Sequence, residues 1–279
     1  MNLNEMCNGI NMPEEVTKEV IKLHGELDYA ALKSASEKLY SRPRWQEGLE
    51  ELKSALGKDE KGLKILTLML ATGLDTYNHY EEKNISQKIF FDTFKCFSRF
   101  VREHMVSFKT YGFDREWWTP RQISMEEFRL GELEFEVENW KGETVISVHI
   151  PSDAKITREN CLESYHQAKE FFSGHYPELE YKYFICDSWM LSPGLKEVLS
   201  PESRILQFQQ DYTIEEWNKD DSSYMEWVFK NTKLTFEEMP EETSLQRNIK
   251  RFIKDGGLIG SAFGYIKKDE LMPSKLLEL

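Results

Sequence analysis

Three segments in the second half of the sequence carry polar side chains at every other residue, the spacing that places them on one side of a β-strand. Their chemical types suit proton transfer and attack on carbonyl carbons, with carboxylates and an imidazole as bases and a thiol as a nucleophile. By segment, these residues are Glu134 and Glu136, Ser147 and His149, and Cys186 and Ser188. If the strands are neighbours, one sheet face gathers them all, together with Gln207 and Gln209 of a fourth segment.

This polar cluster is a candidate site because polar groups inside a sheet cost free energy unless they are paired or used. Two other interpretations stay open. The cluster could be an exposed sheet face, or its members could be isolated core residues with hydrogen-bond partners. A single histidine such as His149 is more often structural than catalytic.

A second candidate directly follows the strand that carries His149. Pro151 ends that strand, and Thr157 is placed to cap a helix over residues 158–175. A helix N-terminus offers amide donors and the positive end of a dipole, which suit a phosphate group, and Lys155 and Arg158 add positive charge. An ordinary strand-to-helix loop would explain the same spacing.

The two halves of the sequence differ in the period of their apolar residues. Helical spacing predicts helices over residues 13–24, 30–40, 45–56, 61–80 and 86–108. The later pattern predicts a hairpin over 128–150 with a bulge at Gly131, a helix over 158–175, strands over 181–190, 204–214 and 260–266, and helices over 193–199, 222–229 and 245–254. We therefore predict an α+β protein with a helical N-terminal domain, residues 1–118, and a mixed-sheet domain, residues 119–279.

Composition excludes several classes of protein. The 279 residues are 40% hydrophobic and 30% charged, and no apolar run approaches the roughly 20 residues that span a bilayer, so we expect a cytoplasmic protein without a membrane partner. The net charge of −13 disfavours a nucleic-acid partner. The four cysteines and six histidines show no metal-ligand spacing, so we expect no metal. Motifs of P-loop enzymes, nucleotide-dependent dehydrogenases and serine hydrolases are absent.

A family resemblance rests on the succession WWTPRQ, FRLGELEFE, VHIPSDAKIT, CLESYHQAKEFF, YKYFICDSWML and RILQFQ. This succession resembles bacterial two-domain acyltransferase-type proteins, which join a helical N-acyltransferase N-terminal domain to a GNAT-like C-terminal domain. The resemblance covers nearly the whole chain and is most specific over residues 117–210. It implies a GNAT-like sheet domain, an acyl-CoA co-substrate (acetyl-CoA or longer), and acyl transfer to an amine or related nucleophile on a small-molecule acceptor.

The resemblance also implies roles for the candidate residues. Coenzyme A would lie against His149, Ile150, Ser152, Ala154, Lys155, Thr157 and Arg158, with its pantetheine arm between the strands at 143–150 and 181–190. His149 or Glu134 would act as the base. Ser188 or Cys186 would orient the acceptor or donate to the leaving sulfur. The loop IPSDAKIT departs from the usual Arg/Gln-x-x-Gly-x-Gly/Ala pattern, and the predicted helix after Pro193 has no tyrosine to serve as the acid.

Two alternatives to direct transfer remain open at this stage. The chain could be a non-catalytic GNAT-like module that binds an acyl-CoA or a peptide. It could also use Cys186 with His149 in a covalent route. The apolar residues around Cys186 would raise the pKa of its thiol, so we favour direct transfer over the covalent route.

Overall fold

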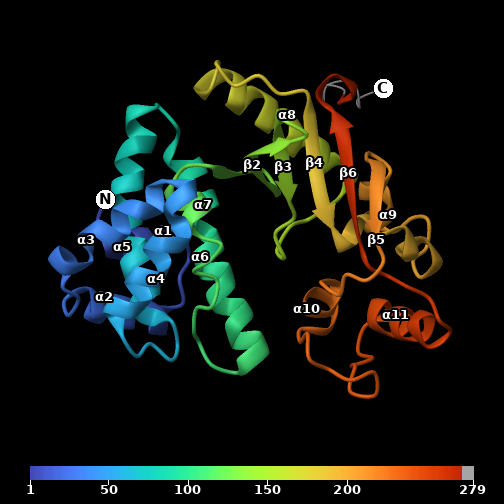
Figure 1. The fold of residues 1–279 in the computed structure, drawn as a ribbon, viewed down its shortest axis with the longest axis horizontal. Coiled ribbons are helices and arrows are strands. Elements are labelled where there is room, and N and C mark those ends of the chain that lie inside the picture. Colours follow the sequence, from blue (N-terminus) through green and yellow to red (C-terminus); the bar gives the residue numbers. More distant parts are fainter. Residues whose placement is uncertain (272–279) are drawn as a thin grey trace. The chain divides into compact units, whose positions relative to one another are not determined.

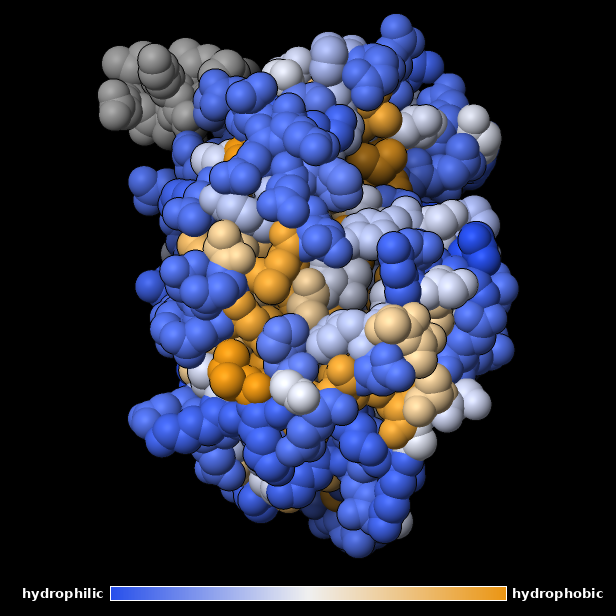
Figure 2. Space-filling model, turned by 90° about the vertical axis from the view of Figure 1, so that its left-hand side faces the viewer, coloured by the Kyte–Doolittle hydropathy of each residue, from blue (hydrophilic) through white to orange (hydrophobic). Residues whose placement is uncertain are grey.

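The computed structural model describes residues 1–271, and the chain divides into two compact units, Met1–Leu130 and Gly131–Leu279 (Figure 1). Residues 119–130 pack within the first unit. There the Thr119 hydroxyl donates to the sulfur of Met69 over 3.1 Å, and the Thr76 hydroxyl donates to the carbonyl of Ile123 over 2.9 Å. Among the described helices, none has the length and apolarity needed to cross a bilayer. Hydrophilic residues cover most of the surface seen in Figure 2.

The first unit is helical, as the sequence predicts. Its elements are α1 (Leu3–Gly9), α2 (Glu14–His24), α3 (Tyr29–Glu37), α4 (Trp45–Leu56), α5 (Leu63–Glu82), α6 (Gln87–Phe108), α7 (Pro120–Ile123) and β1 (Glu127–Leu130), with 3-10 turns at Lys38–Tyr40 and Arg42–Arg44. The apolar stripe of α6 forms the core. Phe94 stacks on both Phe90 and Phe97, with ring centroids 4.3 and 5.6 Å apart, and all three are fully buried. The apolar stripe of α6 therefore packs the interior of this unit.

The second unit is built on a mixed sheet in which the strands run in the order β2-β3-β4-β6-β5. The strands are β2 (Leu133–Trp140), β3 (Glu143–His149), β4 (Tyr183–Ser188), β5 (Thr213–Asn218) and β6 (Ser261–Lys267). The helices are α8 (Arg158–His175), α9 (Arg204–Gln209), α10 (Tyr224–Phe229) and α11 (Ser244–Lys254), with 3-10 turns at Trp189–Leu191, Pro193–Glu197 and Lys268–Glu270. β3 and β4 are parallel, and the other pairs of this unit are antiparallel. The α+β prediction is confirmed.

Helix α8 covers one face of this sheet. The Thr157 hydroxyl caps the helix by accepting a hydrogen bond from the amide of Asn160, and the helix has the predicted bounds. Tyr165 of α8 contacts the rings of Phe135 on β2 and Phe184 on β4, with centroids 6.0 and 5.3 Å apart. These three side chains are almost wholly buried and make this the apolar face of the sheet.

Two local predictions are wrong. Residues 204–209 form α9 instead of a strand, because the Ser203 hydroxyl accepts from the amide of Leu206 and starts a helix. Gln207 and Gln209 therefore do not extend the polar sheet face. At Gly131 the chain turns between β1 and β2 with a positive φ of 70°, where a bulge within one strand was expected. A β-carbon there would lie 2.5 Å from the Ser164 hydroxyl, so only glycine fits.

Candidate active site

The register of the strands decides which predicted residues share a face. Glu134 pairs with His149, and Glu136 pairs with Ser147, so these four side chains lie on the face opposite α8. The parallel register pairs Ser147 with Ile185, so Cys186 points the other way. The expectation that one face gathers all the candidates is therefore wrong for Cys186 and Ser188, which share the face of Phe184 under α8. The prediction that polar residues alternate along each strand is correct. The register of β4 on β3, however, pairs Ser147 with Ile185 and not with Cys186, and this difference of one residue puts Cys186 on the opposite face.

One contact on the polar face joins His149 to Glu136. Nε2 of His149 lies 2.9 Å from Oε2 of Glu136. The Glu136 side chain is 1% exposed, whereas that of His149 is 25% exposed. The two residues are diagonal neighbours on β2 and β3, within reach of a long side chain. A buried carboxylate thus fixes one edge of an imidazole that remains accessible to solvent.

Glu134 lies directly across from His149 in the strand register and is buried. Both bases proposed from the sequence therefore belong to one small region at the end of β3. The sequence analysis includes Glu136 in the polar cluster but gives it no role in the chemistry. Its placement follows from the hairpin turn, because a two-residue loop at Lys141 and Gly142 sets the register of β2 on β3.

Cys186 lies in a different environment. It is fully buried, and removal from water raises the pKa of its thiol well above the ordinary value. The Tyr212 hydroxyl bonds to this thiol and also lies 2.6 Å from the hydroxyl of Tyr165. Burial raises the pKa of both tyrosines far above the ordinary value. These groups stay protonated at neutral pH, so the covalent route through Cys186 has no thiolate. Tyr212 follows α9. Its position could not be predicted, because the sequence analysis expected a strand over residues 204–214.

Ser188 serves the local fold. Its hydroxyl accepts a hydrogen bond from the amide of Met190 over 3.1 Å and caps the 3-10 turn that follows β4. This contact holds the end of β4 in place. The structure therefore gives Ser188 a capping contact and does not place it on the face of His149.

The pairing between β3 and β4 ends close to His149. Both strands are fully described, and along them β3 and β4 pair at only two positions. The second of these positions pairs Ser147 with Ile185. Beyond it, β3 continues to His149 against β2, and β4 continues to Ser188 against β6. Backbone groups along the inner edges there are not used in β3–β4 pairing. This is the place where the resemblance to acyltransferases puts the pantetheine arm of coenzyme A, an extended chain whose own amide groups can bond to strand edges.

The loop expected to hold phosphate is already engaged within the chain. The backbone amide of Lys155 donates to Glu132 over 2.9 Å, and Nη1 of Arg158 lies 2.6 Å from the carboxylate of Asp211. Burial raises the pKa of the Asp211 carboxyl, although Arg158 opposes this shift. The Arg158 side chain remains 47% exposed and has donors besides the one on Asp211. The loop can therefore offer this guanidinium to a phosphate while Asp211 holds it.

The other predicted cofactor-binding residues lie along the same loop. Ile150 follows directly after β3, and Ser152 and Ala154 belong to a turn closed by the amide of Ala154 on the carbonyl of Pro151, 3.0 Å apart. Thr157 uses its hydroxyl as the cap of α8. The loop thus connects the end of β3 to the N-terminus of α8.

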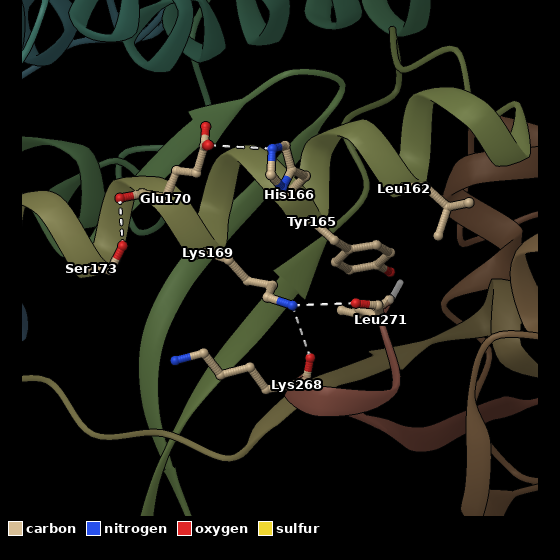
Figure 3. A pocket seen from close by; sticks show the side chains of 8 residues that line it. All are labelled: Leu162, Tyr165, His166, Lys169, Glu170, Ser173, Lys268 and Leu271. Carbon is tan, nitrogen blue, oxygen red and sulfur yellow. Dashed lines mark hydrogen bonds and ion pairs between the residues drawn. The ribbon is translucent and has the colours of Figure 1, made fainter. Parts of the chain in front are cut away.

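A cavity of about 380 Å³ lies elsewhere, along α8 (Figure 3). Leu162, Tyr165 and Leu271 contribute its apolar lining. The amine of Lys169 donates to the carbonyls of Lys268 and Leu271, each over 3.2 Å, and so anchors the chain after β6. None of the residues predicted to form the site lines this cavity. The candidate site is therefore the polar face at the end of β3.

A sheet split between two parallel strands, with a helix following the first of them, defines a GNAT-like domain. The family model described as GNAT-like C-terminal domain matches residues 127–266, and the N-acyltransferase N-terminal domain model matches residues 1–125. The chain belongs to the GNAT-like C-terminal domain family. The predicted resemblance to two-domain acyltransferase-type proteins is confirmed.

Solved structures show the same fold. A crystal structure of an acyltransferase in complex with decanoyl-CoA and teicoplanin matches with a TM-score of 0.80 and 23% identity, covering 94% of this chain and 86% of that chain. An acyltransferase in complex with CoA and 10C-teicoplanin matches with the same TM-score and coverage at 22% identity. An acyltransferase mutant in complex with octanoyl-CoA matches at 21% identity, again with a TM-score of 0.80 and the same coverage. No curated protein sequence matches the chain.

Proposed function

We propose that the chain is an acyltransferase that moves an acyl group from an acyl-CoA to an amine, or a related nucleophile, of a small acceptor. The carrying observation is the position of His149, which contacts buried Glu136 at the point where β3 and β4 cease to pair. The solved structures that share this fold support the proposal, since their complexes contain decanoyl-CoA, octanoyl-CoA and teicoplanin.

Different residues of this chain then bind the donor and transfer the proton. Backbone groups at His149 and Ile150 hold the donor's arm at the end of β3, and Arg158 holds a phosphate at the start of α8. The acyl-CoA supplies a thioester carbonyl at the point where β3 and β4 cease to pair. His149 removes a proton from the acceptor nitrogen as the N–C bond forms and the C–S bond breaks. The proton stays on the imidazole, and the sulfur leaves as a thiolate that takes a proton from water.

The first experiment measures donor binding directly. Calorimetry and thermal unfolding with acetyl-, octanoyl- and decanoyl-CoA should show saturable binding, with about 2.7 kcal/mol of stabilisation at 100 times Kd. Arg158→Gln should weaken binding about tenfold or more. Arg204→Gln is the matched control, because Arg204 is exposed and is likewise the first residue of a serine- or threonine-capped helix. No binding at millimolar coenzyme A would refute the proposal.

One observation favours the alternative of a non-catalytic GNAT-like module. Arg158, expected to meet phosphate, already has Asp211 as an ion-pair partner, and the backbone amide of Lys155 already donates to Glu132. A module of this type would bind acyl-CoA or a peptide without turnover. Release of free thiol from acyl-CoA in the presence of a panel of small amines separates the two, because only an acyltransferase couples thiol release to acylated amine.

A further inference from the structure

Four aromatic side chains gather on the sheet face that carries His149, opposite α8. They are Trp140 at the end of β2, Tyr183 at the start of β4, and Phe263 and Tyr265 on β6. The ring of Trp140 contacts the other three, at centroid distances of 5.2 to 5.6 Å. Unlike the rings under α8, all four remain partly exposed, so they offer a stacking surface to an aromatic ligand. We call these four residues the aromatic face.

Asp187 extends the aromatic face toward the end of β3. It follows Ile185 on the same side of β4 and pairs with Phe263 of β6. Because β3 and β4 run parallel and pair Ser147 with Ile185, Asp187 and His149, each two residues further along, stand at the same end of the same face. A ligand that lies on the aromatic face with one group at Asp187 therefore points toward the end of β3.

Three carboxylates meet at the Asp187 end of this face. Partial removal from water, and then the negative charges of Asp221 and Glu216, raise the pKa of the Asp187 carboxyl. Across residues 1–271, no lysine or arginine forms an ion pair with any of the three. A cationic ligand would supply the positive charge that this end lacks, whereas an anionic ligand would add to the repulsion.

The Trp140 end of the aromatic face has a different charge pattern. Lys141 lies over the indole ring, with its amine 4.5 Å from the ring centroid, and forms an ion pair with Glu215. Lys267, on the same end of β6, lies 2.8 Å from the carboxylate of Glu270. Both cations thus have an acidic partner. The unbalanced negative charge beside the rings lies at the opposite end, and this asymmetry would orient a ligand that has a ring and a cation.

We infer that the aromatic face and Asp187 form the acceptor-binding surface, and that the acceptor is a cationic amine that carries an aromatic ring. The ring stacks on Phe263 and Tyr265, and the ammonium group binds Asp187. Before attack, the ammonium donates one proton to water, and the neutral nitrogen then reacts as in the proposed function. The inference rests on that function and adds the chemical class of its acceptor.

Binding of three small probes to the full chain tests this inference without acyl transfer. Phenethylamine has both ring and cation, phenethyl alcohol has the ring without the charge, and n-hexylamine has the charge without the ring. Titrations followed by nuclear magnetic resonance should show phenethylamine bound at least about threefold more tightly than either of the others. Equal affinities for phenethylamine and either control, or no saturable binding of phenethylamine at tens of millimolar, would overturn the inference.

Two variants with matched controls assign the binding to this surface. Asp187→Asn should weaken the binding of phenethylamine at least about threefold and leave that of phenethyl alcohol unchanged, and Asp187→Glu should recover part of the loss. Asp269→Asn, which neutralises an exposed aspartate in the turn after β6, should change neither. Phe263→Leu should weaken the binding of phenethylamine but not of n-hexylamine. Phe252→Leu, at a partly exposed ring on α11, is its control.

Kinetics separates this inference from the proposed function. With phenethylamine as acceptor, Asp187→Asn should raise the KM for the amine at least about threefold and leave the KM for octanoyl-CoA within about twofold. If phenethylamine binds as expected but no amine releases thiol from acyl-CoA, the proposed function fails and the binding surface stands. If amines are acylated but n-hexylamine serves as well as phenethylamine, and Asp187→Asn acylates both like the unmodified protein, the proposed function stands and this inference fails.

Discussion

The two faces of the sheet in the second unit are made by the same strands and have opposite chemistry. The α8 face carries aromatic rings, a protonated thiol and paired tyrosine hydroxyls, all buried. The other face carries Glu134, Glu136 and a partly exposed His149. Burial under α8 keeps Cys186 protonated and inert, whereas the end of β3 leaves the imidazole accessible. The difference teaches that the face of a strand, more than the intrinsic reactivity of its side chains, decides which of them can take part in chemistry.

The largest expected effect comes from removal of the base. His149→Gln should lower kcat by about 10²–10⁴-fold, the usual contribution of a positioned base, or about 2.7–5.4 kcal/mol in barrier height. Steady-state assay with octanoyl-CoA and the best amine of the panel measures this. An activity within a factor of three of the unmodified protein would move the chemistry away from this face.

The α8 face should respond in stability and not in chemistry. Phe184 is fully buried and contacts the rings of Phe135, Tyr165 and Tyr181. Phe184→Ala should lower the free energy of unfolding by about 3–5 kcal/mol, because it removes apolar contacts and leaves a cavity. Urea denaturation checks this. Ser147→Ala, on the opposite face, is the control and should change stability by less than about 1 kcal/mol.

A smaller effect should follow from the tyrosine pair. Tyr212→Phe removes a hydroxyl that bonds to Tyr165 and to the thiol of Cys186. The free energy of unfolding of the variant should fall by about 1 kcal/mol. This is the typical net contribution of a buried hydrogen bond, including a cost for the partner group that no longer has a hydrogen bond. Thermal unfolding at several urea concentrations measures the change. A gain in stability would mean that these hydroxyls are strained in the native protein.

The smallest effect should come from the thiols. All four cysteines are buried, and burial raises the pKa of Cys7 to about 11 and of Cys161 to about 12. At pH 8, a thiol with a raised pKa of 11 is ionised in only about one molecule in a thousand. A disulfide reagent should therefore label no cysteine of the native protein and all four after unfolding.

Cys186→Ala completes this comparison of the two faces. The direct route does not use the thiol, so the variant should keep turnover within about tenfold, less than about 1.4 kcal/mol in barrier height. Intact mass after single turnover should show no acylated protein. An acyl group trapped on Cys186 would reverse the roles assigned to the two faces.

Much of the fold follows from local sequence patterns. The bounds of α8 come from the Thr157 cap and the apolar spacing behind it, and the β2–β3 hairpin comes from alternation on either side of a two-residue turn. The segment 204–209 could not be assigned in this way, because its apolar residues fit a strand as well as a helix. The Ser203 hydroxyl, placed as a helix cap, is the signal that decides between them.

The candidate site was predictable where its partners are close in sequence. Glu136 and His149 meet across one short hairpin, so alternation and turn length together suffice to bring them together. Cys186 lies on β4, which joins the sheet only after the crossover through α8. No local sequence pattern specifies whether Ser147 of β3 pairs with Ile185 or with Cys186 of β4. Long-range packing of Phe184 under Tyr165 sets that register. A parallel neighbour is therefore harder to place from sequence than a hairpin partner.

The short pairing of β3 with β4 also bears on how the protein avoids self-association. Unpaired strand edges at the rim of a sheet can recruit strands from other molecules and lead to aggregation. Here the unpaired stretch lies in the interior, and each strand is held on its far side, β3 by β2 and β4 by β6. The stretch where β3 and β4 do not pair with each other therefore presents no sheet edge to another molecule.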